Sequence, residues 1–124
     1  MIEIRREDFS IDEIVEGMKR PGIGAILAYV GTVREFPKGA GIKFEDDENA
    51  TAVRKLGEIK ERAIARFDIE DVAIIHRVGF LPVSENILLV AISAAHREPA
   101  FDALRSIIDD IKDFHKAWKR EVRK

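Results

Sequence analysis

Residues 87–94 read Ile87-Leu-Leu-Val-Ala-Ile-Ser-Ala94 and carry no charge, which makes them the clearest structural signal in this chain of 124 residues. Aliphatic and β-branched side chains fall on both faces of such a stretch, so it predicts a strand buried on both sides. Downstream, the sequence predicts a long helix from Pro99 towards the C-terminus, since proline is favoured in the first turn of a helix. Upstream, residues 72–78 predict another strand, which continues past Gly79 to residue 83.

The N-terminal part of the chain predicts two strands around one helix. Ile2 and Ile4 alternate with charged residues, which is typical of a short half-buried strand. Ser10 and Glu13 form an S-x-x-E capping box ahead of apolar residues at helical spacing, so a helix is expected over residues 10–20. Residues 23–33 are apolar or small on both faces and predict a second strand that is buried on both sides.

The middle of the chain predicts a loop, a short strand and a second helix. A mobile loop is expected over residues 34–41, followed by a strand at residues 42–44. The acidic run at residues 45–48 is interpreted as a solvated bend that leads into a helix capped by Asn49. That helix has an apolar stripe at 3.6-residue spacing, made of Ala52, Leu56, Ile59, Ala63 and Phe67. The order β-α-β-β-α-β-β-α, without a repeat or linker, predicts one α/β domain over residues 1–124.

The composition excludes several classes of protein. The chain has 21 Lys and Arg against 23 Asp and Glu, a net charge of −2, and no cysteine, which excludes disulfides, thiol nucleophiles and iron–sulfur clusters. A pI of about 5.9 argues against a nucleic-acid partner, because such binding needs a basic face. The longest uncharged stretches, residues 22–33 and 86–95, are shorter than the roughly 20 residues that span a membrane. We therefore expect a cytoplasmic protein that binds neither nucleic acid nor membranes.

The junction Ala94-Ala-His-Arg-Glu-Pro99 is one candidate site. The backbone N–H groups in the first turn of the predicted helix are free, and together with His96 and Arg97 they form a site that suits phosphate or carboxylate. The alternative is structural, with His96 capping the helix and Arg97 paired with Glu98 at the surface. The local sequence leaves both interpretations open.

The predicted C-terminal helix has one apolar stripe with two lysines on its edge. The stripe consists of Leu104, Ile107, Ile108, Ile111, Phe114, Trp118 and Val122. Lys112 and Lys119 are seven residues apart, which is roughly 10 Å along the flank of a helix. A lysine at such a margin either keeps its amine in water or, when desolvated beside another cation, loses its proton and acts as a nucleophile or general base.

No other motif predicts a site. Residues 22–24 lack the third glycine of a dinucleotide fingerprint. Ser93 lacks the flanking glycines of a nucleophile elbow, so it is interpreted as a core residue. The histidines lack the spacing of a metal site; they are His76, His96 and His115. We therefore expect no metal, no cofactor and no serine hydrolase.

Four segments in this order nevertheless resemble one known family. They are Val30-Gly-Thr-Val-Arg34, Val72-Ala-Ile-Ile-His-Arg-Val-Gly79, Ala94-Ala-His-Arg-Glu-Pro-Ala-Phe-Asp-Ala103, and Ile111-Lys112 followed by Trp118-Lys-Arg-Glu121. Together with the spacing of the two lysines, they resemble the large, catalytic subunit of molybdopterin synthase over nearly the whole chain.

The resemblance implies both a fold and a reaction. The fold is of the α/β (α+β) class, a mixed and mainly antiparallel sheet packed by three helices with a hammerhead-like shape. The family adds two sulfur atoms to cyclic pyranopterin monophosphate to form the dithiolene of molybdopterin. The sulfur comes from the C-terminal Gly-Gly thiocarboxylate of a small ubiquitin-like subunit, and two large subunits form a homodimer within a heterotetramer. A chain without cysteine fits an enzyme that receives its sulfur from another protein.

The resemblance also assigns residues by position. Lys119 matches the essential lysine and is expected to attack or protonate the reacting assembly, while Lys112 is expected to hold the thiocarboxylate and assist proton transfer. Arg34, His96 and Arg97 match substrate-binding positions, where guanidinium groups and a helix terminus suit phosphate. The rest of the expected substrate-binding set is Thr32, Val33, Arg120 and Glu121.

The last helix departs from the family pattern. Residues 114–117 lack the proline that relatives often place before the aromatic residue of the lysine motif, so an unbroken helix is expected. The chain ends five residues after Lys119. We therefore expect the substrate to be bound mainly by residues of the same chain, namely Arg34, His96, Arg97 and Arg120. An arginine of the neighbouring subunit is not expected to contribute.

Two other functions are consistent with the same residues. One is a non-catalytic oligomeric domain that binds a small anionic metabolite through His96 and Arg97, with the two lysines serving only the structure. The other is a scaffold that binds the partner tail without turnover.

Overall fold

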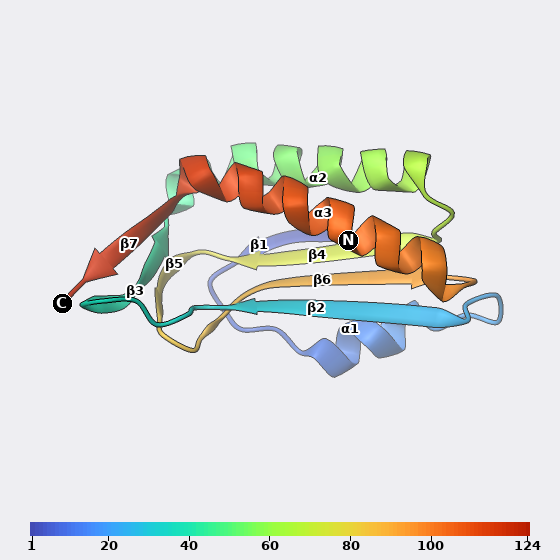
Figure 1. Cartoon of the computed structure of the whole chain (residues 1–124), viewed down its shortest axis with the longest axis horizontal. Coiled ribbons are helices and arrows are strands. Elements are labelled where there is room, and N and C mark those ends of the chain that lie inside the picture. The colour runs from blue at the N-terminus through green and yellow to red at the C-terminus, as the bar shows by residue number, and fades with distance from the viewer.

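The computed structural model describes the backbone of all 124 residues and the side chains of all except Glu48 (Figure 1). It has three α-helices, one 3₁₀ turn and seven strands. In chain order these are β1 (Ile2–Arg5), α1 (Ile11–Met18), β2 (Ala25–Thr32), β3 (Gly39–Phe44), η1 (Asp46–Glu48), α2 (Asn49–Arg66), β4 (Asp71–Arg77), β5 (Gly79–Pro82), β6 (Asn86–Ala94), α3 (Arg97–Trp118) and β7 (Lys119–Arg123).

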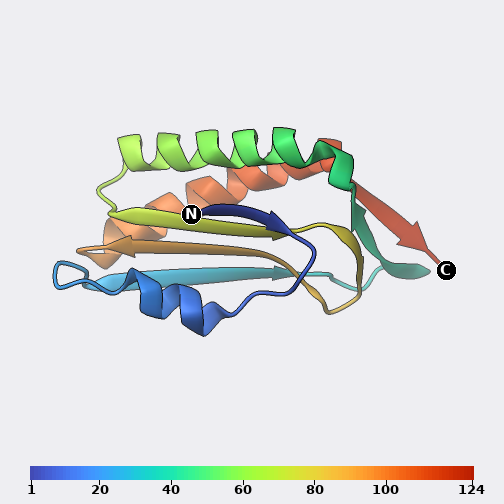
Figure 2. The ribbon, with the colours of Figure 1, turned by 180° about the vertical axis from the view of Figure 1, so that it is seen from behind.

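The larger sheet has four strands in the order β1-β4-β6-β2, and only the β1–β4 pair is parallel. Residues 87–94 of β6 are all buried, Ser93 included, which confirms the prediction for this stretch. The helices α2 and α3 cover one face of the sheet and α1 covers the other (Figures 1 and 2). Val90 packs in the core with α2 and α3, whereas the adjacent Leu89 packs with Phe9 near α1, as the two-residue period of a strand requires. The predicted fold class is confirmed.

The prediction that residues 23–33 form a strand buried on both sides is wrong in one respect. The strand β2 exists, but it begins at Ala25 and lies at the edge of the sheet, paired only with β6. Its side chains are half-buried or exposed. An uncharged edge strand leaves backbone N–H and C=O groups free to pair with another chain.

The smaller sheet has three antiparallel strands in the order β5-β3-β7 and projects from one end of the larger sheet, which gives the hammerhead-like shape (Figure 1). The strand predicted over residues 72–83 is split between the two sheets, because the chain turns at Gly79, whose φ is +88°. The predicted loop is also shorter than residues 34–41, since Gly39 to Gly41 already belong to β3.

Two of the predicted helix starts can be compared with the structure directly. The capping box is confirmed, because Oγ of Ser10 accepts a hydrogen bond from the backbone N–H of Glu13 at 3.3 Å. The predicted cap at Asn49 is wrong: Asn49 has helical dihedral angles and is the first residue of α2, after the 3₁₀ turn, whereas a cap residue is extended. The predicted stripe of α2 is buried from Ala52 to Ala63, and Phe67 follows the end of the helix.

The helix α3 joins the two ends of the molecule. It begins at Arg97, two residues before the predicted Pro99, and runs unbroken to Trp118, as expected from the missing proline. Its 22 residues correspond to about 33 Å. The prediction that the helix continues towards the C-terminus is wrong after Trp118, because Val122 lies in β7 and pairs with Gly41 instead of extending the apolar stripe.

Candidate active site

A cavity of about 540 Å³ lies where the two sheets meet the end of α3. Its wall is formed by the end of β2, the β2–β3 connection, the start of β6, the last turns of α3 and the start of β7. Of the expected site residues, the cavity brings together Thr32, Val33, Arg34, Lys112, Lys119 and Glu121.

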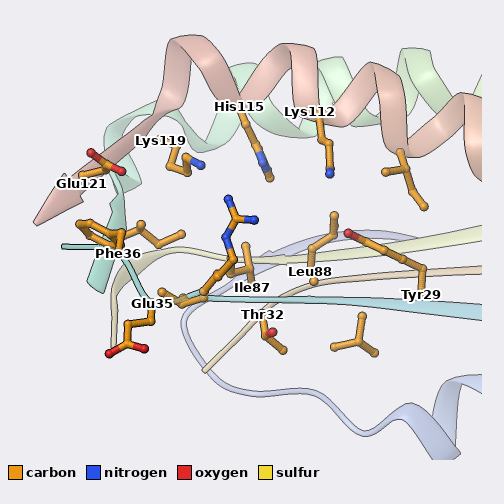
Figure 3. Close-up of a pocket in the computed structure, with 16 residues that line it drawn as sticks. Tyr29, Thr32, Glu35, Phe36, Ile87, Leu88, Lys112, His115, Lys119 and Glu121 are labelled. Carbon is orange, nitrogen blue, oxygen red and sulfur yellow. The ribbon is translucent and has the colours of Figure 1, made fainter. Parts of the chain in front are cut away.

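Lys112 and Lys119 reach this cavity from two different elements. Lys112 extends from α3, whereas Lys119 is the C-cap of α3 and the first residue of β7, with an extended backbone. The prediction that both lie on the flank of one continuous helix is therefore wrong for Lys119. Figure 3 shows both side chains pointing from this end of α3 towards the strands that carry Tyr29 and Leu88. Neither amine forms an ion pair with a carboxylate whose side chain the structure describes, in contrast to Lys116, which pairs with Asp113 at 3.0 Å on the solvent side.

Arg34 is positioned by the residue before it. The side chain of Val33 is buried, and both of its backbone groups are used: its N–H donates to the carbonyl of Glu85 at 2.9 Å, and its carbonyl accepts from Ser84 at 2.8 Å. These contacts fix the chain directly after β2. Arg34 follows this fixed point and lines the cavity with an exposed side chain.

A pair of histidines lies behind the two lysines. Nδ1 of the fully buried His76 is 2.7 Å from the carbonyl of Arg77, and its Nε2 is 2.8 Å from Nε2 of His115. Because a carbonyl only accepts, His76 carries its proton on Nδ1, and the hydrogen bond between the rings is donated by His115. Burial, followed by the proximity of His115, lowers the pKa of His76 to about 3. Burial and the positive charges of Lys119 and Lys112 lower the pKa of His115 to about 4.

Three of the expected substrate-binding residues do not reach the cavity within one chain. His96 and Arg97 lie at the opposite end of α3, about 22 Å along the helix from Lys112. The ring of His96 makes no capping hydrogen bond, and Arg97 pairs loosely with Glu98 at 3.7 Å while remaining 78% exposed. Arg120 lies on β7 between two cavity residues and faces the other side, because successive side chains of a strand alternate.

This chain is similar in sequence to proteins of one known family. A family model described as MoaE protein matches residues 4–114. The chain belongs to the MoaE family. The molybdopterin synthase catalytic subunit of Pyrococcus abyssi is 36% identical over 118 residues, covering 94% of this chain and 80% of the relative. The protein of the same name from Thermoplasma volcanium is 31% identical over 123 residues, covering 98% and 90%.

Solved structures share the fold of this MoaE-family chain. The molybdopterin biosynthesis MoaE protein from Burkholderia ambifaria superposes with a TM-score of 0.82 at 31% identity, covering 98% of this chain and 88% of that chain. Molybdopterin synthase from Staphylococcus aureus superposes with a TM-score of 0.84 at 27% identity, covering 98% and 90%. The family expected from the sequence is confirmed.

The described residues of this MoaE-family protein contain no group of three or more metal-ligating side chains. Across the same part of the chain, no helix has the length and apolar character needed to cross a bilayer.

His115 lines this site although it is not among the residues predicted from the sequence, where it was considered only as a metal ligand. The signal was its position three residues after Lys112 and four before Lys119, since side chains at these spacings share one face of a helix. The contact with His76 depends on the sheet and could not be read from local sequence.

Proposed function

We infer that this protein is the catalytic subunit of a molybdopterin synthase, a sulfurtransferase of molybdenum cofactor biosynthesis. It transfers sulfur from the C-terminal Gly-Gly thiocarboxylate of a small ubiquitin-like sulfur-carrier subunit to cyclic pyranopterin monophosphate, forming the molybdopterin dithiolene. The observation that carries this conclusion is the cavity at the end of α3, where Lys112, Lys119 and Arg34 lie together in a chain of the MoaE family.

The charges of the cavity suit these two substrates. A thiocarboxylate and a phosphate are both anions, and ammonium and guanidinium groups bind them by charge-assisted hydrogen bonds. The two lining carboxylates are Glu35 and Glu121, and Glu121 is already paired with Arg123 at 3.2 Å. The unpaired lysine amines are therefore available to bound anions.

The two lysines have different roles in this proposal. Lys119 stands at the junction of α3 and β7, and it attacks or protonates the reacting pterin and thiocarboxylate groups. Lys112 lies on the preceding helical turns, where it holds the incoming thiocarboxylate and assists proton transfer. Thr32, Val33 and Glu121 complete the wall around these groups.

The sulfur has to arrive on another molecule, because the chain contains no cysteine. A flexible C-terminal tail is a suitable carrier, since it can enter the cavity while the folded part of the small subunit stays outside. The catalytic subunits form the homodimer at the centre of a heterotetramer with two such carriers.

The phosphate end of the pterin needs groups that one chain does not bring to the cavity. We propose that His96 and Arg97 of a second copy bind it, together with Arg34 of the first copy. Two observations support this: both residues are exposed at the far end of α3, and the uncharged edge strand β2, whose Tyr29 and Val30 line the cavity, leaves backbone groups free for a second chain. Arg120 faces away from the cavity of its own chain, so this proposal gives it no contact with the substrate there.

The alternative of a non-catalytic anion-binding domain has less support. In that interpretation the ligand binds at His96 and Arg97, and the lysines are structural. The described cavity lies instead with Lys112 and Lys119, at the other end of α3. A scaffold without turnover would use the same cavity, so only an activity measurement separates it from the enzyme.

The test is reconstitution of the purified protein with a thiocarboxylated small subunit and cyclic pyranopterin monophosphate. The enzyme produces dithiolene, and the small subunit is left with an ordinary C-terminal carboxylate. A binding domain or scaffold forms the complexes without product, and that result would contradict the proposed function.

Two further expectations belong to this proposal. Residues 1–124 form one domain, which is supported by a core cluster that contains both Phe44 of the smaller sheet and Val90 of the larger sheet. The protein acts in the cytoplasm. The single domain is tested by denaturation, in which the protein should unfold in one transition. The location is tested by cell fractionation, in which the protein should be recovered from the cytoplasmic fraction.

A further inference from the structure

His115 stands between the two lysines of the cavity. It lies three residues after Lys112 and four before Lys119, and Figure 3 shows its ring extending towards the cavity between them. Unlike the lysines, it is partly buried, and its ring packs against Phe44 with centroids 5.1 Å apart. The ring is therefore held in one place at the wall of the site.

The hydrogen bonds of the pair fix the tautomers of both rings. His76 donates from Nδ1 to the carbonyl of Arg77, so its Nε2 accepts the proton on Nε2 of His115. The structure gives the remaining ring nitrogen of His115, Nδ1, no hydrogen bond to a described residue, and this nitrogen is not among the buried atoms that lack a partner, so it is open to the cavity. A neutral His115 therefore presents the lone pair of Nδ1 to the cavity.

The same geometry accommodates a protonated His115 without rearrangement. An imidazolium carries protons on both nitrogens. Its Nε2 proton is already accepted by His76, and its Nδ1 proton would occupy the free position. His76 cannot easily take that charge itself, because it is fully buried and Nδ1 is committed to a backbone carbonyl. This is the arrangement of a proton-transfer group held in orientation by a second residue.

The charges around His115 make its protonation depend on what occupies the cavity. Lys112 and Lys119 face it from α3 and β7, His76 from β4, Arg34 and Glu35 line the cavity from the β2–β3 connection, and Glu121 lines it from β7. In the protein alone, burial and the ammonium groups of Lys119 and Lys112 lower the pKa of His115 to about 4. A bound anion offsets the ammonium charges, so it favours the protonated ring.

We propose that His115 is a further proton-transfer residue of this site, which takes up one proton on Nδ1 when an anionic substrate binds beside Lys112 and Lys119. The proton comes from solvent. It is then transferred to a sulfur or oxygen anion released during sulfur transfer, which leaves His115 neutral again. His76 is the positioning residue that keeps the ring in the required tautomer. The catalytic step rests on the proposed function, whereas the proton uptake does not.

Two measurements on the full chain test the uptake without turnover. NMR of ¹⁵N-histidine-labelled protein follows the titration of His115 with and without saturating inorganic pyrophosphate as the anion. The titration midpoint is expected to rise by about one unit or more with the anion, because a nearby opposite charge shifts a pKa by that much. Calorimetry in buffers of different ionisation enthalpy is expected to show proton uptake on pyrophosphate binding. A titration of His115 that is unchanged by the anion would overturn the proposal.

The matched variant is His115→Gln, whose amide still donates to His76 but cannot be protonated. It is expected to bind pyrophosphate without the wild-type proton uptake and to lower kcat roughly 100-fold, in the range of general acid–base catalysis. Wild-type kcat with an unchanged pH profile in this variant would contradict the proposal, whereas an inactive wild type would instead contradict the synthase function.

The positioning role of His76 is tested by a second pair of variants. His76→Gln keeps an acceptor for His115 and a donor to the carbonyl of Arg77, so it is expected to retain the proton uptake. His76→Leu removes the acceptor, so the His115 signals are expected to shift towards the Nδ1–H tautomer. If the leucine variant does not fold, the tautomer seen in the glutamine variant decides: loss of the Nε2–H form there contradicts the positioning role.

Discussion

Lys119 pairs with Phe44 across β7 and β3, and the same residue ends α3. This pairing explains why the lysine faces the cavity. The helix would carry the chain onward along its axis, but the extended backbone at Lys119 turns it into the smaller sheet. The position of the lysine therefore depends on a contact between residues that are 75 positions apart in the sequence.

Phe44 should accordingly be necessary for both stability and activity. Its ring is fully buried and lies within about 5 Å, centroid to centroid, of the rings of His76, His115 and Trp118. Phe44→Ala is expected to lower the free energy of unfolding by about 3–5 kcal/mol, as measured by urea denaturation. Phe80→Ala is the control on the neighbouring β5, because its ring is 47% exposed, and it should change stability by less than about 0.5 kcal/mol. An equal loss of stability in the two variants would contradict the role of Phe44 as a core residue of this region.

Gly79 is expected to stabilise the corner between β4 and β5. Its φ of +88° is a conformation that residues with a Cβ rarely adopt. The atom nearest to an added Cβ is Nη1 at the exposed end of the Arg6 side chain, which can move aside, so the backbone conformation decides the effect. Gly79→Ala should therefore destabilise the protein by about 1 kcal/mol or more. Gly57→Ala is the matched control inside α2, where an added Cβ meets no atom within 4 Å, and it should stabilise by up to about 1 kcal/mol. Thermal denaturation measures the midpoint of unfolding, which should fall for Gly79→Ala and rise for Gly57→Ala. A change of the midpoint in the same direction for both variants would contradict the prediction.

Part of the fold could be predicted from local sequence alone. The central strand β6 and the capping box at Ser10 are examples, because a run of apolar residues and an S-x-x-E pattern are each contained within a few consecutive residues. The division at Gly79, the turn at Lys119 and the edge position of β2 depend on which strands pair, and pairing is not encoded in the period of one segment.

The candidate site was predictable to a similar extent. The seven-residue spacing predicted only that Lys112 and Lys119 share one flank of a helix, and the helix ends before the second lysine. Both nevertheless line one cavity, because the turn into β7 keeps Lys119 on the same side. The anion site at His96 was grouped with them through the family resemblance. The unbroken length of α3 separates the two groups within one chain, and nothing in the local sequence gives the position of a second copy.

The buried histidines predict a specific dependence of stability on pH. An unfolded histidine binds a proton near pH 6.5, whereas His115 in the folded protein does so near pH 4 and His76 near pH 3. Below pH 6.5 the unfolded state therefore binds more protons, so stability is full above pH 6.5 and falls as the pH decreases through this window. Between pH 6.5 and pH 4, the protonation of His115 alone lowers the free energy of unfolding by an amount on the order of 3 kcal/mol.

Urea denaturation at pH 7.5 and pH 4.5 measures this loss, and His115→Gln provides the comparison. The variant should lose less stability than the wild type between the two pH values, because it lacks one of the two groups. A wild type and variant that lose the same free energy of unfolding would contradict the lowered pKa of His115.

Mixed dimers test whether His96 and Arg97 act on the cavity of a second copy. Each homodimer of Lys119→Ala or Arg97→Ala has two defective sites. If Arg97 acts across the dimer, a heterodimer of the two variants contains one intact site, so a 1:1 co-refolded mixture should recover about a quarter of the wild-type activity. No recovery above that of the separate variants would place Arg97 in the cavity of its own chain or outside the reaction.

The most direct test of the central claim is the rate of dithiolene formation by three lysine variants, measured with a thiocarboxylated small subunit and cyclic pyranopterin monophosphate. Lys119→Ala should lower the rate by at least about 100-fold, and Lys112→Ala should also lower it, because both amines face the cavity. Lys116→Ala, which removes an exposed lysine paired with Asp113 on the same helix, should retain the wild-type rate. Wild-type rates for both Lys119→Ala and Lys112→Ala would contradict the claim that this cavity is the catalytic site.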